Sequence, residues 1–500
     1  MTAGHLLTSW LDPSLFAATA LGTLAGIWIG AIPGLSVTMA VSILVSFTFA
    51  WPLEPALALM AGVFTGGVYG GSRSAILLNI PGAPAAIATA LDGYPMARRG
   101  EAGAAIGLTT LASFLGGMIG VAALALGAPA IAEVAILFAP RDYLLLAVLG
   151  LLLVGSLSGE SLAKGLFAAG LGVTLGVVGL DPMTAEPRFT YGSVALLGGI
   201  PYIAAMIGFF GVAEALAQLR LADAETVRQR IGRIVPPRAA LRRHLPLALR
   251  ASGIGVAIGA LPGTGGDIAA LMAYDHARRS TRTPTHPFGT GAEEGVVAPE
   301  AANNAAVGGA YIPMLTLGIP GDAVTAVLIG ALYVHGLKPG PMLMIETPHL
   351  FWFTVGNLTL ANVALLAFGL AGARAFARIA EVPRAVLVPL ILVLSVVGTF
   401  AIRNSLADVW WMLGFGITGY ALRLYGFQPG PIILGMILGP LMDASWRRAV
   451  IAAGDDVLGA AVEATESAIS LVLIAAIVLI ALRSFSWGKG RKALPPTPHP

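Results

Sequence analysis

The chain has 500 residues, of which 57% are hydrophobic and only 11% are charged. A soluble globular protein carries about 25% charged residues, so this composition excludes an ordinary soluble protein. The formal net charge of +3 gives no indication of nucleic-acid binding, and the absence of cysteine excludes disulfide, thiolate and iron–sulfur chemistry.

Apolar runs long enough to cross the roughly 30 Å hydrocarbon core of a bilayer recur along the chain. They predict an all-α, polytopic membrane protein of roughly 10–14 spans, since each span needs about 20 residues. The spans predicted in the first half are 15–33, 35–50, 57–79, 103–129, 142–157, 162–180 and 193–217. Because the first basic residue is Arg73, residues 1–30 lack the positive start of a secretory signal and are expected to stay in the membrane.

A basic segment separates the two halves of the chain. Residues 218–250 hold eight arginines against two acids, with Pro236-Pro237 between them. By the positive-inside rule this linker is expected in the cytoplasm, as is the Pro-rich tail 485–500, which is expected to be disordered. The spans predicted in the second half are 250–277, 301–334, 350–373, 384–402, 406–424, 428–442 and 466–483.

Two Pro-Gly motifs of the first half return in the second. The run Gly30-Ala31-Ile32-Pro33-Gly34 matches Gly259-Ala260-Leu261-Pro262-Gly263 at an offset of 229 residues. The run Leu78-Asn79-Ile80-Pro81-Gly82 matches Leu317-Gly318-Ile319-Pro320-Gly321 at an offset of 239, so the polar stretch 275–295 must absorb ten extra residues. These matches predict two related transmembrane halves, 1–217 and 251–465, which are typical of secondary transporters.

The charges predict different numbers of spans in the two halves. An uncharged amino terminus outside and a basic linker inside imply an odd first half, whereas a basic tail inside implies an even second half. Either one apolar run is re-entrant, or a final span at 466–484 lies outside the repeat. We favour the extra span.

A Pro-Gly pair inside an apolar run indicates a helix that ends and restarts within the protein. The restarting half presents unpaired N–H groups and the positive end of its dipole, which suit a carboxylate. The alternative is that Pro and Gly only kink helices or allow close packing, but four breaks in matched pairs favour a functional role. The predicted substrate contacts at the breaks are Gly34, Gly82, Gly263 and Gly321.

Polar side chains near the first pair of breaks extend this predicted substrate site. The neutral hydrogen-bonding members are Ser36, Thr38, Ser72, Ser74 and Asn79. Arg73 is a guanidinium within an apolar segment, so it should face a cavity, a partner carboxylate or an anionic substrate. Its alternatives are a structural pair with Asp92 or Glu101, or snorkelling to the membrane interface.

Polar side chains near the second pair of breaks predict a coupling-ion site. Glu300, Asn303 and Asn304 form a tight cluster at the start of a long apolar run, and Thr316 follows. Such oxygens beside broken helices suit Na⁺ or a proton, so Asn303, Asn304 and Thr316 are the predicted coupling-ion residues. No other metal and no cofactor is expected, and Glu300 is equally explained as an acid in the first turn of a helix.

Enzyme chemistry is not expected from this sequence. Asp267 and the pair Tyr274-Asp275 lie too close together to place two carboxylates on neighbouring spans, as an intramembrane aspartyl protease requires. The pair Asp455-Asp456 lacks the second acidic pair of a magnesium-dependent prenyltransferase. The seven histidines lack the spacing of a zinc site.

These motifs resemble those of the large membrane subunit of the tripartite tricarboxylate transporter family, the TctA-like proteins. The resemblance covers about residues 15–440 and is carried by 30–35, by 62–82 with Asp92-Gly93-Tyr94-Pro95-Met96-Ala97, and by 294–320 with His335-Gly336-Leu337-Lys338-Pro339-Gly340-Pro341. Where this chain has Arg73, Asp267 and Asp322, the family more often has small neutral residues, and it often has Gln at Lys338.

The resemblance implies ion-coupled uptake of carboxylates such as tricarboxylates or dicarboxylates, with sodium as the expected ion, across a bacterial inner membrane. It also implies two partners, a small four-span membrane subunit and a periplasmic solute-binding protein. The alternative is a partnerless secondary transporter or a channel for another small organic anion. Uptake against a gradient would separate a transporter from a channel.

Overall fold

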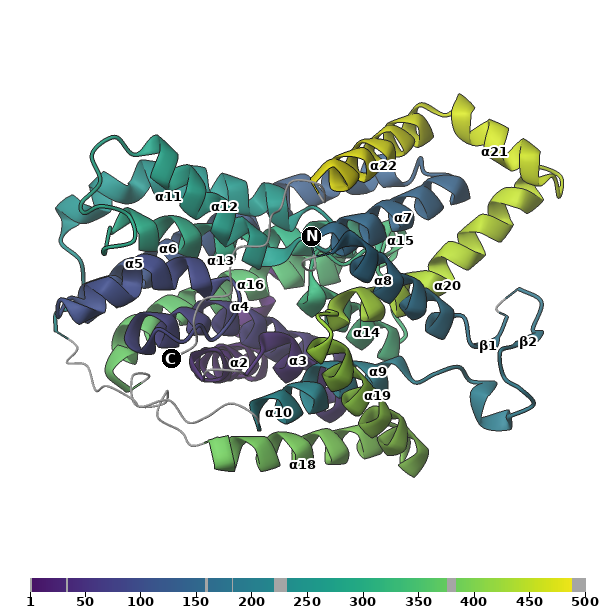
Figure 1. Cartoon of the computed structure of the whole chain (residues 1–500), viewed down its shortest axis with the longest axis horizontal. Coiled ribbons are helices and arrows are strands. Elements are labelled where there is room, and N and C mark those ends of the chain that lie inside the picture. The colour runs from purple at the N-terminus through teal and green to yellow at the C-terminus, as the bar shows by residue number, and fades with distance from the viewer. Residues whose placement is uncertain are drawn as a thin grey trace. The chain divides into compact units, whose positions relative to one another are not determined.

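The computed structural model describes residues 2–32, 35–157, 161–181, 183–219, 232–375 and 384–487 (Figure 1). Almost all of these residues with regular structure are helical, which confirms the all-α class. The chain divides into two compact units, one of Met1–Ile136 and Pro201–Ala421 and one of Leu137–Ile200 and Leu422–Pro500. Each unit takes segments from both predicted halves, so the compact units do not coincide with the predicted halves 1–217 and 251–465. These two ranges remain a prediction about the repeat.

The first unit contains both pairs of predicted helix breaks. Its elements are α1 (Thr2–Leu11), α2 (Pro13–Ala31), α3 (Val37–Thr48), α4 (Leu53–Leu78), α5 (Ala86–Arg98), α6 (Ala102–Ala135), α9 (Tyr202–Met206), the π-helical η2 (Ile207–Val212), α10 (Ala213–Gln218), α11 (Arg238–Gly259), α12 (Gly265–Ser280), α13 (Glu294–Leu317), α14 (Ala323–Val334), α15 (Pro341–Glu346), α16 (Pro348–Ala371), α18 (Arg384–Arg403) and α19 (Leu406–Leu424).

All four helix breaks occur where the Pro-Gly motifs predict them. They separate α2 from α3, α4 from α5, α11 from α12, and α13 from α14. Two of the interrupted helices end in the same way, because Asn79 after α4 and Gly318 after α13 both adopt the left-handed conformation, with φ of 56° and 70°. Asn and Gly are the residues that adopt this conformation most readily. Helix α5 was not among the predicted spans.

The glycine contacts of the two copies match residue by residue. A Cβ at Gly26 would overlap the carbonyl of Val63, and one at the equivalent Gly255 would overlap the carbonyl of Ala302, which is equivalent to Val63. The same correspondence holds for three further pairs of glycines, namely Gly30 with Gly259, Gly70 with Gly309, and Gly82 with Gly321. Each copy is therefore built on a close backbone packing of its first helix, α2 or α11, against its second, α4 or α13.

The half-helices of the two copies pair across the repeat. Helix α5 packs against α12, and α3 packs against α14. Helix α3 of the first copy is equivalent to α12 of the second, and α5 is equivalent to α14. The α3/α14 pair is therefore the counterpart of the α12/α5 pair, with the two copies exchanged. The ten extra residues of the second copy fall at the end of α12 and in the loop 281–293, within the predicted stretch 275–295.

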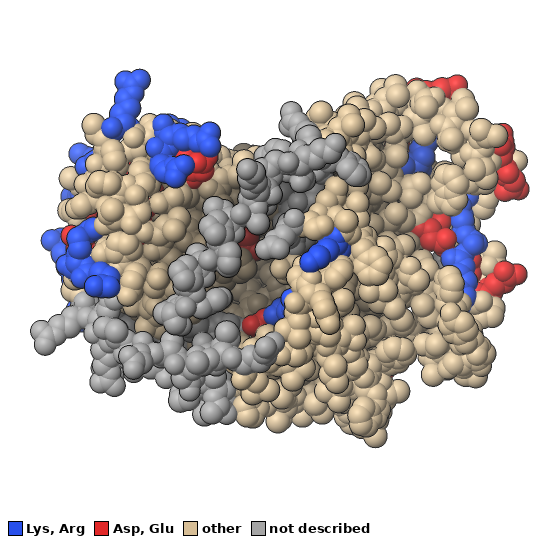
Figure 2. All heavy atoms as spheres, viewed as in Figure 1, with Lys and Arg blue, Asp and Glu red and all other residues tan. Residues whose placement is uncertain are grey.

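The α5/α12 side of the first unit and the α3/α14 side differ in charge. The exposed arginines of the α5/α12 side lie at the end of α5 (Arg98 and Arg99), at the start of α11 (Arg238, Arg242 and Arg243) and at the end of α12 (Arg278 and Arg279). Figure 2 shows blue side chains gathered on the left of the molecule, where Figure 1 places α5 and α11. Helices α3 and α14 carry no charged residue. By the positive-inside rule the basic end is the one expected in the cytoplasm.

Several helices are suited to a membrane. Among the described residues, α2, α6 and α16 are each long and apolar enough to cross one alone, and the bent pair α21 (Val457–Glu466) and α22 (Ala468–Trp487) would make a fourth crossing. Helices α3 and α14 have 12 residues each and are too short to cross alone. The total of roughly 10–14 spans stays a prediction, because broken helices contribute to spans only in combination.

The second unit is a smaller helical cluster. It contains α7 (Pro140–Leu157), α8 (Leu162–Gly176), the antiparallel hairpin of β1 (Gly179–Leu180) and β2 (Pro187–Arg188), the 3₁₀ turn η1 (Val194–Leu196), α20 (Pro429–Ala452), α21 and α22. Helix α20 packs against α7 and α8. Asp181 pairs with Arg188 and with Arg447, the latter at 2.7 Å, which ties the hairpin to α20. The predicted final span, 466–484, corresponds to α22, and most of the predicted tail lies outside the described residues.

We expect the packing of α11 on α13 to depend on the absence of a side chain at Gly255. Replacing Gly255 with Val should lower the unfolding temperature strongly or abolish folded protein, because overpacking against the backbone of Ala302 costs about 1–3 kcal/mol or more. Gly253→Val is the matched control on the same helix, since a Cβ there meets nothing within 4 Å. Thermal unfolding in detergent would test this, and equal unfolding temperatures for the two variants would contradict it.

Candidate functional site

The N-terminal ends of four half-helices meet at one cavity of about 130 Å³. The residues that open α3, α12 and α14 line it, as do those immediately before α5. Its described lining is Ser36, Val37, Thr38, Phe64, Val68, Ala83, Pro84, Ala85, Gly265, Gly266, Asp267, Asn303, Val307, Asp322, Ala323 and Val324. Helix N-termini carry unpaired N–H groups and a positive partial charge, so their convergence favours an anion.

The lining consists of eight pairs of equivalent residues from the two copies. The pairs are Ser36 with Gly265, Val37 with Gly266, Thr38 with Asp267, Phe64 with Asn303, Val68 with Val307, Ala83 with Asp322, Pro84 with Ala323, and Ala85 with Val324. The cavity is thus built equally from both copies of the repeat. Its side chains are not equivalent, because both carboxylates and the amide come from the second copy, whereas the first copy contributes two hydroxyls.

Side chains of the protein cap three of the four N-termini. The Ser36 hydroxyl accepts a hydrogen bond from the N–H of Met39 in α3, at 3.0 Å. Asp267 accepts one from the N–H of Ala85, which precedes α5, at 2.9 Å. Asp322 accepts one from the N–H of Thr325 in α14, at 2.7 Å, and forms a capping box with it.

Helix α12 is the exception among these four, since no side chain caps it. The hydroxyl of Thr264, at the position before the helix, instead donates to the carbonyls of Ile258 and Leu261. Gly265 adopts a positive φ of 65°, and a Cβ at Gly266 would overlap the side-chain oxygen of Asn303. Two glycines thus bring the uncapped backbone of α12 to the cavity wall, a close approach that glycine permits.

Asn303 is the buried polar group of this cavity. The residue is only 5% exposed, and its amide faces the cavity without a hydrogen bond to another described residue. Buried amides normally have partners. Asp322 is half-buried and Asp267 is accessible from the cavity, and the two carboxylates interact electrostatically. No Lys, Arg or His belongs to the lining as far as it is described.

The structure separates the residues predicted for the substrate site. Ser36 and Thr38 line the cavity, and Gly34 lies outside the described residues. At the helix breaks, Gly82 packs against Gly30 and Gly321 packs against Gly259. Gly263 donates its N–H to the Pro320 carbonyl at 3.2 Å. Asn79 is exposed and ends α4 in the left-handed conformation. Ser72, Arg73 and Ser74 are fully buried in α4, away from the described lining. Asp267 and Asp322 line the cavity although they were not in the predicted set.

Arg73 belongs to a buried polar network between α4, α6 and α13. Its guanidinium donates to the hydroxyls of Thr109, at 2.5 Å, and Ser72, at 3.1 Å, and lies 4.3 Å from the ring centre of Tyr69. The charge of Arg73 acts on Glu300, whose carboxylate accepts hydrogen bonds from Thr89 and Ser113 at 2.7 and 2.9 Å. Among the described residues, the hydrogen bonds of the Arg73 guanidinium go to Ile106, Ser72 and Thr109 and not to Asp92 or Glu101, the structural partners considered from the sequence.

The predicted coupling-ion residues are also dispersed. Asn303 lines the cavity, whereas its neighbour Asn304 donates to the Glu300 carbonyl at 3.1 Å, and its buried side-chain oxygen has no hydrogen-bond partner among the described residues. The Thr316 hydroxyl donates to the Ile312 carbonyl of its own helix at 2.7 Å. Of the three residues, Asn303 is the one that contacts the cavity.

Asp92 in α5 fixes the loop that precedes α13. One carboxylate oxygen accepts the N–H groups of Gly289, Gly291 and Ala292, each at 2.8 Å, and the other accepts the Tyr274 hydroxyl at 2.9 Å. Arg99 donates to carbonyls of the same loop. At the same end of the loop, the hydrogen bond between His244 and Glu293 lowers the pKa of the Glu293 carboxyl below its usual range in spite of partial burial. These contacts hold α5, α12 and α13 together beside the cavity.

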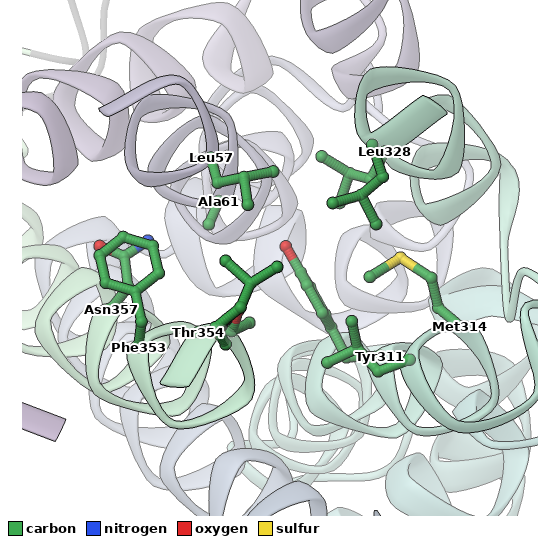
Figure 3. Close-up of a pocket in the computed structure, with 11 residues that line it drawn as sticks. Leu57, Ala61, Tyr311, Met314, Leu328, Phe353, Thr354 and Asn357 are labelled. Atoms are coloured by element: carbon green, nitrogen blue, oxygen red, sulfur yellow. Dashed lines mark hydrogen bonds between the residues drawn. The ribbon is translucent and has the colours of Figure 1, made fainter. Parts of the chain in front are cut away.

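A second cavity lies between α4, α13, α14 and α16 (Figure 3). Its volume is about 20 Å³, which is room for about one water molecule. Figure 3 shows Leu57, Leu328 and Met314 around the Tyr311 ring, with Asn357 at one side. This cavity is too small and too apolar for an organic anion, so the cavity of the four N-termini is the candidate site.

Duplicated broken membrane helices that enclose a polar cavity are the architecture of a multi-pass membrane transporter. Residues 16–434 match the family described as "Tripartite tricarboxylate transporter TctA family". The chain therefore belongs to the TctA family, the membrane components of tripartite tricarboxylate transporters. This confirms the resemblance drawn from the motifs.

Two similar proteins come from Agrobacterium vitis. The chain is 35% identical over 465 residues to "Uncharacterized 52.8 kDa protein in TAR-I ttuC' 3'region", covering 93% of this chain and 92% of that protein. It is 37% identical over 202 residues to "Uncharacterized protein in TAR-II ttuC' 3'region", covering 40% of this chain and 83% of that protein. No solved structure matches the chain.

We expect the loop 281–293 to open when Asp92 is replaced by Ala. Loss of four hydrogen bonds to a buried carboxylate costs about 3 kcal/mol or more, so trypsin should cut the exposed Arg282 much faster. Tyr274→Phe removes one of the four bonds and is the matched control, with a cleavage rate near that of the unaltered protein. The unfolding temperatures of the unaltered chain, Asp92→Ala and Tyr274→Phe would be measured in parallel. Equal rates of tryptic cleavage for all three would show that Asp92 does not hold the loop.

Proposed function

We propose that this chain is the large membrane subunit of a binding-protein-dependent transporter that couples carboxylate uptake to the entry of sodium or protons. Its partners are a small four-span membrane subunit and a periplasmic solute-binding protein, and it resides in a bacterial inner membrane. Family membership supports the tripartite assembly. The convergence of four helix N-termini on one cavity, built from both copies of the repeat, is the observation that supports the carboxylate substrate.

The charges of the cavity support coupling to a cation. Asp267 and Asp322 line it, and the described lining has no basic side chain. An anion that enters meets like charges unless a cation accompanies it or a carboxylate takes up a proton. Carboxylate oxygens are also suitable ligands for Na⁺, which prefers hard oxygen donors as Ca²⁺ and Mg²⁺ do. The cation therefore balances the charge of the substrate in the cavity, and the two must move together.

Asn303 is the predicted coupling-ion residue that fits this proposal best. Its amide offers an oxygen to a cation and N–H groups to an anion, so it can contact either member of the transported pair. Asn304 and Thr316, which form hydrogen bonds within their own helix, are second choices for a direct ion contact.

Transport by the reconstituted complex would test the proposed function. Proteoliposomes would hold this chain with its small subunit, and radiolabelled lactate, malate and citrate would be added with and without the binding protein. We expect accumulation above equilibrium only with an inward sodium or proton gradient and with the binding protein. Collapsing the gradient with an ionophore is the control. Equilibration that is indifferent to both gradient and binding protein would contradict the proposal and indicate a channel or a partnerless carrier.

A further inference from the structure

We propose that the cavity holds one substrate carboxylate, at the N-terminus of α12, and that Asp267 and Asp322 exclude additional carboxylates. This chain would then prefer hydroxylated monocarboxylates to dicarboxylates and tricarboxylates. The inference rests on the proposed carboxylate transport and specifies the substrate class of the same site.

A substrate carboxylate in this cavity needs hydrogen-bond donors. Without a basic side chain in the described lining, an anion must bind to helix N-termini, hydroxyls and amides. Three of the four N-termini already bind side chains of the protein, through Ser36, Asp267 and Asp322. Two of these caps are carboxylates, so the protein's own acids occupy the positions at α5 and α14 that substrate carboxylates would otherwise take.

The N-terminus of α12 is the position that remains for a substrate carboxylate. Helix α12 begins at Gly265 and Gly266 without a side-chain cap, and its backbone lies directly at the cavity. Asn303 lies against Gly266 and lines the cavity; the residue is only 5% exposed, and its amide has no hydrogen-bond partner among the described residues. The N–H donors and the oxygen of this amide are therefore available to a ligand in the cavity. One substrate carboxylate could accept hydrogen bonds both from the backbone N–H groups in the first turn of α12 and from the side-chain amide of Asn303.

The rest of the substrate would lie beside Asp267 and Asp322. Asp267 lies in the first turn of α12, and the Asp322 Cβ would be 3.3 Å from a Cβ at Gly265, so both acids lie beside the proposed carboxylate position. Ionised carboxylates accept hydrogen bonds and do not donate them. They would therefore bind hydroxyl groups of a substrate and repel a second carboxylate. Equivalent positions in the first copy, Thr38 and Ala83, carry no such charge.

A series of hydroxy acids with one, two and three carboxylates tests this preference. Lactate, malate and citrate would be compared in the reconstituted complex, and we expect uptake in that order. In Asp267→Asn and Asp322→Asn, the amide oxygen can still cap the same helix while the charge is lost. The ratio of malate uptake to lactate uptake should then rise at least tenfold in either variant. Asp275→Asn is the matched control, since Asp275 is a half-buried residue of α12 that pairs with Arg279 at 2.8 Å and is not part of the described cavity lining.

The outcomes separate this inference from the proposed function. Preferential accumulation of citrate by the unaltered chain would overturn the inference and leave carboxylate transport standing. An unchanged malate-to-lactate ratio in both Asp267→Asn and Asp322→Asn would also overturn it. If none of the three acids accumulates under any gradient, the proposed function itself has failed.

A substitution at Asn303 tests the proposed carboxylate position directly. Asn303→Asp keeps the shape and the oxygen of the side chain but removes its N–H donors. If Asn303 binds the substrate carboxylate, the variant should lose lactate uptake at least tenfold through a higher KM, while protein yield and unfolding temperature stay near those of the unaltered chain. Retained lactate uptake with altered sodium dependence would assign Asn303 to the cation and overturn its role in binding the substrate.

Discussion

The organisation of this protein depends on the need to satisfy backbone N–H groups where a helix restarts inside a membrane protein. Hydrocarbon offers no hydrogen bonds, so a broken helix is stable only where its exposed amides face a cap, a ligand or a cavity. Here the breaks of both copies bring four such N-termini to one cavity. The glycine contacts of α2 with α4 and of α11 with α13 hold the breaks in place, because backbones can approach closely only where side chains are absent.

The repeat gives the cavity a symmetric frame with asymmetric chemistry. Equivalent backbone positions supply its whole described lining, yet the side chains differ: Thr38 is equivalent to Asp267, Phe64 to Asn303, and Ala83 to Asp322. A duplicated backbone fixes where side chains project and leaves their identity free. Substrate and ion preference can therefore differ between members of one fold through a few positions at the helix N-termini, without a change in how the helices pack.

The sequence predicts the frame better than the contacts within it. Pro-Gly pairs indicate helix breaks through local backbone chemistry, so all four breaks lie where expected, and Ser36, Thr38 and Asn303 contact the cavity. Helix α5 was missed because Asp92, Tyr94 and Pro95 interrupt its apolar pattern. The hydrogen bond from Ala85 to Asp267 and the interaction of Arg73 with Glu300 join residues 182 and 227 positions apart, and no local pattern encodes such pairings.

The positions of the two acids suggest how binding could be coupled to movement. Asp267 joins α12 to α5, one pair of half-helices, whereas Asp322 caps α14, which packs on α3 in the other pair. A ligand that contacts both acids therefore contacts both pairs, and its binding energy depends on their relative position. A ligand shifts a conformational equilibrium only through such differential contact. Two ligands that both gain contacts in the same arrangement of the pairs strengthen each other's binding, which is the thermodynamic requirement for coupled transport.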